Sequence, residues 1–399
     1  MRILMISWEY PPYIVGGLGK HVAELVPAQA SLGLDLHLLT PRWSDTPSRE
    51  SVNGAVIHRV ELSEAGDADF YTRAWQVNLR LEEEAVRLWE ETGGFEIIHA
   101  HDWLTAFSAC ALKRSYHVPL VCTIHATERG RGRGSLPTPM ARAINDVEWW
   151  LTFEAWRVIC CSDYMAQEVR DFFQTPADKI DVIPNGVDTA PFDRWDGVDL
   201  QSFRAMYALP EEKIIFSVGR IVQEKGIETL VRAAPLVLQQ YPFAKFVIAG
   251  TGPHLDYLRQ LSWDLGVGAK VLFTGRIADE DRDRLFKVAD CAVFPSLYEP
   301  FGIVALEAMA AKCPVVVSEV GGLREVVQHG ETGITVYPGD PASISWGILH
   351  TFQHPEWTRA RVSNAYQRVV ELYNWTRIAR LTSAVYERVI AERRLVRDW

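Results

Sequence analysis

The chain has 399 residues, of which 48% are hydrophobic and 23% are charged, and its formal net charge is -10 at pH 7. This composition is globular and excludes a disordered or fibrous protein, and the length suits two domains of about 200 residues each. The acidic excess argues against a nucleic-acid partner and against tight binding to anionic lipid.

Six cysteines occur without any CxxC spacing. We therefore expect reduced thiols in the core and neither a disulfide nor a cysteine-bound metal. The sequence opens directly on a strand-like stretch without a charged and then apolar leader, and no apolar run has membrane-spanning length. We expect a cytoplasmic protein without stable membrane insertion.

The first predicted motif is a strand, a glycine-rich turn and a helix. The strand covers residues 2–7, the turn contains Gly16 and Gly17, and the helix passes through His21. This order is typical of a phosphate cradle, because glycine lets a ligand approach the backbone where a Cβ would clash. A single glycine cluster is weak evidence. Further strands are expected over residues 35–40 and 55–60.

A DxD sequence, Asp67-Ala68-Asp69, comes next. Some enzymes hold a divalent metal with such a pair, but this one precedes a helix instead of ending a strand, so we do not favour a metal role. The helix, predicted over residues 74–91, has an acidic polar face. Such a face is typical of a solvated surface and makes a poor membrane-docking helix.

Histidines gather near the ends of the next two predicted strands. His99 and His101 share one face of their strand, as alternate residues do. A metal pair is one reading, and a positioning or structural role is favoured because no third ligand is spaced for a metal. Asp102 is expected to cap the following helix. The strand over 118–124 places His125 at its carboxyl end, where open α/β sheets put ligand contacts.

Residues 127–134 interleave the three arginines Arg129, Arg131 and Arg133 with glycine. We predict a mobile cationic loop, which is either a lid over an anionic ligand or a solvated surface loop. The sequence favours neither reading.

The boundary between the predicted domains follows Pro184-Asn185-Gly186-Val187-Asp188. The next stretch, to Glu212, is polar, rich in aspartate and weakly periodic, which is typical of a linker. We therefore predict an N-terminal domain over residues 1–186 and a second domain over 187–374.

The second half repeats the alternation of strand and helix. A strand over 214–218 leads through Gly219 and Arg220 to Lys225, just before a helix over 227–240. A cation at a helix N-terminus opposes the helix dipole, so an anionic ligand explains these residues better than structure does. The next strands, 244–249 and 271–273, are each followed by a glycine turn.

The stretch 294–325 contains an apolar helix that is expected to start near Phe301 or Gly302. Such a helix belongs in an interior, and Glu307 in its middle is costly to bury without a partner. Glu299 lies in the loop before the helix, and the two acids are expected roughly 10 Å apart. The helix N-terminus between them suits a phosphate. The plain structural reading is an internal salt bridge for Glu307 and solvent for Glu299.

The tail, residues 375–399, is predicted to form a helix that packs back across the N-terminal domain. Strands alternate with helices in both halves, which indicates an α/β fold with two parallel, doubly wound sheets.

With these motifs in place, the chain resembles the family-4 and family-5 retaining glycosyltransferases of the GT-B fold over essentially its whole length. Two further stretches resemble the bacterial α-glucan synthases of the glycogen synthase-like branch: His99-Ala100-His101-Asp102-Trp103 and Thr123-Ile124-His125-Ala126-Thr127-Glu128. The family motifs stand in order: Pro184-Asn185-Gly186-Val187-Asp188, Gly219-Arg220 with Lys225-Gly226, Glu299-x7-Glu307, and Gly321-Gly322-Leu323.

The resemblance implies two facing Rossmann-like domains and a role for each matched residue. Arg220 and Lys225 would bind a diphosphate, Glu307 the ribose hydroxyls and Glu299 the donor hexose, and His125 would lie near the anomeric carbon. His125, Arg220, Lys225 and Glu299 are thus the predicted catalytic residues, and neither a metal nor another cofactor is required. The remaining predicted donor-binding positions are Gly16, Gly17, Gly219, Gly275, Arg276, Ile277, Phe301, Gly302 and Ile303.

One departure from the family pattern matters. Family-5 glycogen and starch synthases have Lys-x-Gly-Gly-Leu where this chain has Ile14-Val15-Gly16-Gly17-Leu18. The missing cation removes a phosphate contact and places the chain on the family-4 side. It leaves ADP-glucose and UDP-glucose both open as donors.

The implied reaction is the retaining α-(1→4) transfer of glucose from a nucleotide-glucose to the non-reducing end of an oligo- or polysaccharide. Three alternatives stay open: a family-4 transferase with a lipid-linked or small-molecule acceptor, a sugar-nucleotide binding protein without turnover, and an epimerase of the same fold.

Overall fold

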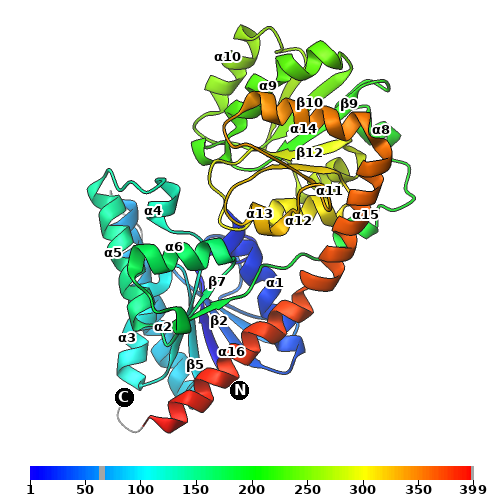
Figure 1. Ribbon diagram of the computed structural model, residues 1–399. Coiled ribbons are helices and arrows are strands. Elements are labelled where there is room, and N and C mark those ends of the chain that lie inside the picture. Colours follow the sequence, from blue (N-terminus) through cyan, green and yellow to red (C-terminus); the bar gives the residue numbers. More distant parts are fainter. Residues whose placement is uncertain (63–67, 397–399) are drawn as a thin grey trace. The chain divides into compact units, whose positions relative to one another are not determined.

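The computed structural model describes residues 1–62 and 68–396, which divide into two compact units (Figure 1). Unit 1 contains the chain up to Gly186 together with the C-terminal helix that begins at Trp375, and unit 2 covers Val187–Asn374. Each unit has its own sheet with helices on both faces.

Unit 1 is built on an eight-stranded sheet in the order β3-β4-β2-β1-β5-β6-β7-β8. All described pairings are parallel except that of β3 with β4. The strand order reverses between β1 and β5, so the loops after these strands flank a topological switch point, where doubly wound sheets bind ligands. The strands are β1 (Arg2–Ile6), β2 (Asp35–Pro41), β3 (Arg49–Val52), β4 (Ala55–Val60), β5 (Ile97–His101), β6 (Leu120–Ile124), β7 (Arg157–Cys160) and β8 (Ile180–Val182).

The helices of unit 1 cover both faces of this sheet. They are α1 (Gly17–Ser31), α2 (Phe70–Thr92), α3 (Ala106–Tyr116), α4 (Glu128–Arg131), α5 (Pro139–Glu154), α6 (Asp163–Phe173) and α16 (Trp375–Leu395), with 3₁₀ turns η1 (Trp103–Thr105) and η2 (Ala177–Lys179).

The C-terminal helix α16 contributes to the core of unit 1. Val22 of α1, Ile378 and Tyr386 of α16, and Ile3 of β1 are fully buried members of one apolar cluster. In Figure 1, α16 (red) runs alongside α1 (blue), and the two helices are in contact. The chain thus passes from unit 2 back into unit 1 at the end of α15 (Pro355–Leu372).

Unit 2 is built on a six-stranded parallel sheet in the order β11-β10-β9-β12-β13-β14. Its switch point lies between β9 and β12. The strands are β9 (Lys213–Val218), β10 (Ala244–Ala249), β11 (Val271–Gly275), β12 (Cys291–Phe294), β13 (Val315–Ser318) and β14 (Ile334–Val336). Its remaining helices are α7 (Ala190–Asp193), α8 (Gln201–Arg204), α9 (Ile227–Gln240), α10 (Leu255–Asp264), α11 (Asp279–Val288), α12 (Ile303–Ala310), α13 (Leu323–Val326) and α14 (Pro341–Gln353), with a 3₁₀ turn η3 (Gln223–Lys225).

Two sequence predictions differ from the structure in unit 1. The expected mobile loop over 127–134 contains the short helix α4, where the Thr127 hydroxyl accepts a hydrogen bond from the Gly130 N–H. Arg129 lies over the ring of Phe172 at 5.2 Å. Of the DxD pair, Asp67 lies outside the described residues. Asp69 accepts a hydrogen bond from the Thr72 N–H and caps α2, which therefore begins before the predicted residue 74.

The expectation of reduced cysteines in the core agrees with the structure. All six are free and buried, so the described chain contains no disulfide.

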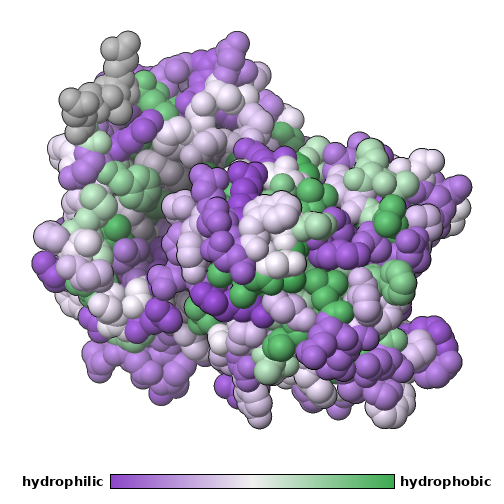
Figure 2. All heavy atoms as spheres, turned by 90° about the horizontal axis from the view of Figure 1, so that it is seen from above, coloured by the Kyte–Doolittle hydropathy of each residue, from purple (hydrophilic) through white to green (hydrophobic). Residues whose placement is uncertain are grey.

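None of the helices in residues 1–62 and 68–396 combines the length and apolarity needed to cross a bilayer. Figure 2 shows polar and apolar side chains interspersed over the displayed face.

Candidate active site

Lys225 and Glu299 meet at the switch point of unit 2. Lys225 Nζ lies 2.6 Å from Glu299 Oε2, and the Ser296 hydroxyl donates to the same oxygen at 3.3 Å. The two side chains are 23% and 10% exposed. Glu299 is therefore buried and paired, which excludes the reading of a merely solvated acid.

Backbone contacts hold the two loops that carry this pair. The Glu224 carbonyl accepts hydrogen bonds from the N–H groups of Leu297 (2.8 Å) and Tyr298 (3.2 Å). Gly226 has φ +64, and a Cβ there would lie 2.0 Å from the Pro295 carbonyl oxygen. Any side chain at position 226 would push the loops apart, so the glycine after Lys225 is a packing requirement.

A third loop, after β13, packs against the same pair of loops. The Gly322 N–H donates to the Glu299 carbonyl at 2.9 Å, and a Cβ at Gly322 would lie 2.5 Å from the Pro300 oxygen. The helix α12 begins at Ile303, so its N-terminus directly follows the loop that carries Glu299. The N–H groups of a first helical turn favour an anionic ligand.

Glu307 is buried in α12 and faces an arginine. Its Oε1 lies 3.9 Å from Nη1 of Arg282, which also bonds Asp283 and Asp279 at 2.8 Å each. Burial lowers the pKa of Arg282, but the negative charges of Glu307, Asp283 and Asp279 outweigh this effect and raise it. The internal salt bridge expected in the plain reading is present, and a ribose-binding role for Glu307 stays a prediction.

The other predicted donor residues of unit 2 lie at the same sheet edge. Arg220 follows β9, is exposed and lies 3.3 Å from Glu224. Gly275 ends β11, its carbonyl accepts the Gly250 N–H at 2.8 Å, and Arg276 beside it is exposed. Arg220 thus lies at the switch point, whereas Arg276 follows the edge strand β11. Of Arg220 and Lys225, Lys225 has the more deeply buried acidic partner.

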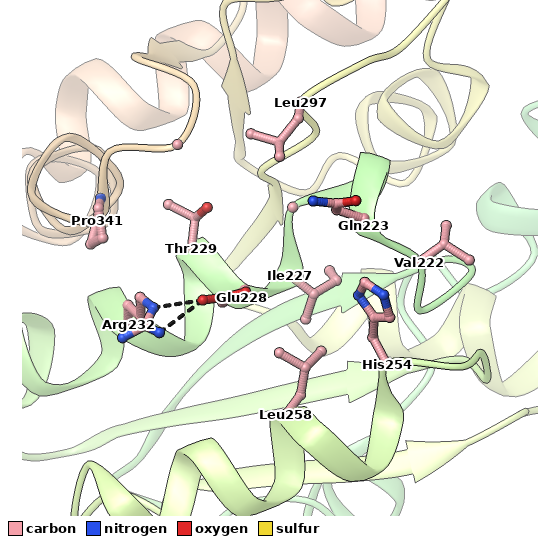
Figure 3. Close-up of a pocket in the computed structure, with 12 residues that line it drawn as sticks. Val222, Gln223, Ile227, Glu228, Thr229, Arg232, His254, Leu258, Leu297 and Pro341 are labelled. Carbon is pink, nitrogen blue, oxygen red and sulfur yellow. Dashed lines mark hydrogen bonds and ion pairs between the residues drawn. The ribbon is translucent and has the colours of Figure 1, made fainter. Parts of the chain in front are cut away.

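A pocket of about 250 Å³ lies beside the Lys225 loop (Figure 3). Its lining includes Gln223 and Gly226, which flank Lys225 in the sequence. The Glu228–Arg232 ion pair of α9, at 2.8 Å, also lines the pocket. Apolar side chains such as Leu258 complete the wall. The predicted donor-binding residues are not among its lining residues, so this cavity adjoins their loop without containing them.

In unit 1, three histidines from separate segments come together. His21 lies on α1, His101 ends β5 and His125 follows β6. One ring nitrogen of each lies within 4.8 Å of the other two. The segments are adjacent because β1, β5 and β6 are neighbouring strands.

Hydrogen bonds fix the orientation of these rings. His21 Nδ1 lies 2.6 Å from Asn185 Oδ1, and His101 Nδ1 lies 3.0 Å from His125 Nε2. The backbone N–H of His125 donates to a carboxylate oxygen of Asp102 at 2.7 Å and fixes the backbone that carries the ring. Burial lowers the pKa of His21 to about 4 and holds the pKa values of His101 and His125 well below the usual 6.5, so all three imidazoles are neutral at pH 7.

The contacts of His99 fit the structural role that the sequence favoured, because its nitrogens bond the Tyr386 hydroxyl (2.6 Å) and the Thr123 hydroxyl (2.8 Å). The expectation for Asp102 was wrong. Asp102 makes no cap hydrogen bond to the following turn and instead holds the backbone of His125. The third histidine, which the spacing did not reveal, is His21.

The glycine turn after β1 already holds a carboxylate. Glu9 Oε2 accepts hydrogen bonds from the N–H groups of Val15 (2.8 Å) and Gly16 (3.1 Å), and a Cβ at Gly19 would lie 2.6 Å from it. The turn is thus built to hold an anionic group, and Glu9 is the group that it holds. A phosphate contact at Gly16 or Gly17 stays a prediction.

Comparisons with known proteins agree with this geometry. Residues 15–191 match the family described as Glycosyltransferase Family 4, and residues 201–368 match Glycosyl transferases group 1. An uncharacterized glycosyltransferase of Methanocaldococcus jannaschii is 40% identical, over 97% of this chain and 98% of that protein. A glycogen synthase of Mycobacterium tuberculosis is 36% identical, over 97% and 94%. The chain belongs to the family-4/5 glycosyltransferases.

Two more distant matches also cover nearly the whole length of both chains. A D-inositol 3-phosphate glycosyltransferase of Acidothermus cellulolyticus is 29% identical to this glycosyltransferase, over 98% of the chain and 91% of the relative. The solved structure of a sucrose-phosphate synthase from Thermosynechococcus elongatus has a TM-score of 0.83 and 26% identity and covers 98% and 99% of the two chains. The fold is therefore GT-B, as the sequence motifs imply.

Proposed function

We propose that this glycosyltransferase moves a glucosyl unit from ADP-glucose or UDP-glucose to the non-reducing end of an α-glucan, with retention of configuration and with an α-(1→4) linkage. The Lys225–Glu299 pair at the switch point of unit 2 carries this proposal. The 36% identity to a glycogen synthase supports the choice of glucose and of a glucan.

The donor end of the reaction belongs to unit 2. Lys225 and Arg220 supply positive charge where the diphosphate would lie, and the N-terminus of α12 adds backbone N–H groups. Positive groups fixed in advance stabilise the negative charge that develops on a leaving phosphate. In this proposal no metal is needed at the diphosphate. Glu299, which holds Lys225 in the free protein, would bind the donor hexose.

The chemical step exchanges one bond to the anomeric carbon for another. The bond from this carbon to the phosphate oxygen breaks, the bond to the acceptor 4-hydroxyl oxygen forms on the same face, and the leaving phosphate takes the hydroxyl proton. The products are a nucleoside diphosphate and a glucan one unit longer. His125, as a neutral imidazole, would donate to or accept from a sugar hydroxyl near this carbon.

A small-molecule acceptor is the second candidate. The full-length similarity to a D-inositol 3-phosphate glycosyltransferase favours it, at a lower identity than that to the glycogen synthase. In this second candidate the donor site of unit 2 keeps its proposed role, and the acceptor is what differs. The cytoplasmic location also stays a prediction.

The deciding experiment offers purified protein radiolabelled ADP-glucose or UDP-glucose with maltooligosaccharides, with inositol 3-phosphate, or with no acceptor. We expect label in longer maltooligosaccharides whose new linkage an α-(1→4)-specific amylase removes. Label on inositol 3-phosphate alone would replace the proposal by the second candidate. No transfer to any acceptor, with the donor intact, would refute both. Lys225→Ala serves as the inactive control.

A further inference from the structure

The three histidines of unit 1 form a group of possible metal ligands, and the proposed transfer uses only one of them. His125 is the only one of them given a role near the reacting carbon, whereas His21 and His101 are buried at 3% and 0% exposure. Histidine is rarely buried three at a time without partners, since each ring has two polar nitrogens. Their grouping therefore calls for a physical reason.

The hydrogen bonds leave one nitrogen of His21 available. The side-chain amide oxygen of Asn185, Oδ1, can only accept a hydrogen bond. His21 Nδ1 therefore carries the proton, and His21 Nε2 carries the lone pair. Among the described residues Nε2 of His21 has no hydrogen-bond partner, and the same holds for Nε2 of His101. His21 shows the pattern of a metal-binding histidine, in which the second ring nitrogen donates to an oxygen that fixes the tautomer. The second nitrogen of His101, Nδ1, contacts Nε2 of His125 at 3.0 Å.

The spacing of the three rings is close to that of a metal site. Nitrogens bound to one tetrahedral Zn²⁺ at 2.0–2.1 Å lie roughly 3.3 Å apart. The ring nitrogens here are within 4.8 Å of one another, and the ring centres of His21 and His125 are 4.8 Å apart. Side-chain rotations that move each ring nitrogen by about an ångström would bring the three nitrogens to this spacing. His125 is half-buried, which gives an ion a route from solvent.

From this arrangement we propose that His21, His101 and His125 bind one transition-metal ion of the Zn²⁺ class, with a water molecule as the fourth ligand. Three neutral imidazoles and an open position are a recurrent zinc donor set. The ion is not part of the transfer reaction.

One consequence rests on the proposed function. If His125 contacts the sugar near the reacting carbon, an ion that takes up a nitrogen of His125 competes with the donor. Zn²⁺ therefore inhibits transfer, and removal of the ion restores it.

Cobalt provides a probe of binding that does not depend on activity. The full-length protein is titrated with Co²⁺ in a non-chelating buffer at pH 7, and its visible absorption is recorded. We expect the intense d–d bands of four-coordinate Co²⁺ at one ion per chain, displaced by one equivalent of Zn²⁺. A thiolate charge-transfer band is not expected, because the group of possible ligands contains histidines and no cysteine.

Variants assign the ligands. His21→Gln and His101→Gln are expected to weaken Co²⁺ binding at least tenfold, and Asn185→Leu, which removes only the partner of His21 Nδ1, about 10- to 100-fold. His58→Gln is the matched control, because it changes a buried histidine pair of the same unit, His37 and His58, that has no third ring. Thermal melting without metal confirms that each variant folds, and Asn185→Leu replaces any ligand variant that does not.

The outcomes separate this inference from the proposed function. Absence of the visible bands, or bands unchanged in His21→Gln and His101→Gln, overturns the metal site whatever the transfer assay shows. Bands that follow the variants support the site even if no acceptor is ever glucosylated. Inhibition by Zn²⁺ that persists in His21→Gln at the same concentration would show that the inhibiting ion binds elsewhere.

Discussion

Lys225 Nζ and Glu299 Oε2 lie 2.6 Å apart at the end of two adjacent strands, β9 and β12. Lys225 is the last residue of the 3₁₀ turn η3, and Glu299 lies in the loop between β12 and α12. Their contact depends on loops that approach within the space of a missing Cβ at Gly226. A buried acid thus holds a cation in the place where a diphosphate would need it, before any ligand binds.

Replacing Lys225 separates catalysis from stability. We expect Lys225→Met to reduce kcat/KM by at least about 100-fold, since one charged contact to the developing phosphate is lost. It also leaves the buried Glu299 without its cationic partner, at a cost of about 1–3 kcal/mol, with only the Ser296 hydroxyl still donating to the same oxygen. The double variant Lys225→Met with Glu299→Gln should recover the stability and not the activity, as measured by urea unfolding and by transfer.

A matched control for that experiment is Lys270, which pairs with Glu212 in the same unit. Lys270→Met should lower stability and leave the KM for the donor unchanged. Equal activity of Lys225→Met and wild type would remove Lys225 from the mechanism.

Glu307 offers a second test, of donor affinity. We expect Glu307→Gln to raise the KM for the nucleotide sugar about 10- to 100-fold, as expected for losing a hydrogen bond from a ribose hydroxyl to a charged group. Arg282 keeps Asp283 and Asp279 as partners, so the fold should survive. Asp279→Asn removes the exposed partner of the same arginine and should leave KM unchanged. An unchanged KM in Glu307→Gln would reduce Glu307 to a structural partner of Arg282.

Buried neutral histidines make stability depend on pH. Burial lowers the pKa of His58 from 6.5 to about 4. Between these values the unfolded chain binds a proton that the folded chain does not, so stability falls as pH drops from about 6.5 to about 4. His58→Gln should flatten this fall by up to about 1.4 kcal/mol per pH unit. Urea midpoints at pH 7 and pH 5 test it, with the exposed His117→Asn as control, and an equal slope in His58→Gln would contradict it.

The cysteines should be inert in the folded protein. Burial raises the pKa of Cys110 to about 12 and holds that of Cys160 well above its usual value, so neither forms the reactive thiolate. A thiol reagent such as Ellman's reagent should label no cysteine of the native protein within an hour and all six in urea. Rapid labelling of the native protein would mean that a cysteine-bearing strand opens readily.

The sequence predicted those features that lie close together along the chain. A strand followed by a glycine turn and a cation predicted the Lys225 loop. The apolar run around Glu307 predicted a buried helix. It did not predict that His21 joins His101 and His125, because these two lie 80 (101 − 21) and 104 (125 − 21) positions after His21 and only the order of the strands brings them together. It also missed Glu9, whose backbone contacts at Val15 and Gly16 depend on the path of a turn and not on residue type.

The central claim is that protein cations, and not a metal ion, neutralise the diphosphate of the donor. Its most direct test is transfer of label from ADP-glucose or UDP-glucose to maltooligosaccharides after exhaustive treatment with EDTA. The claim predicts full activity after chelation in the wild type and a loss of at least about 100-fold in Lys225→Met. Loss of wild-type activity on chelation, with recovery on addition of Mn²⁺, would contradict it.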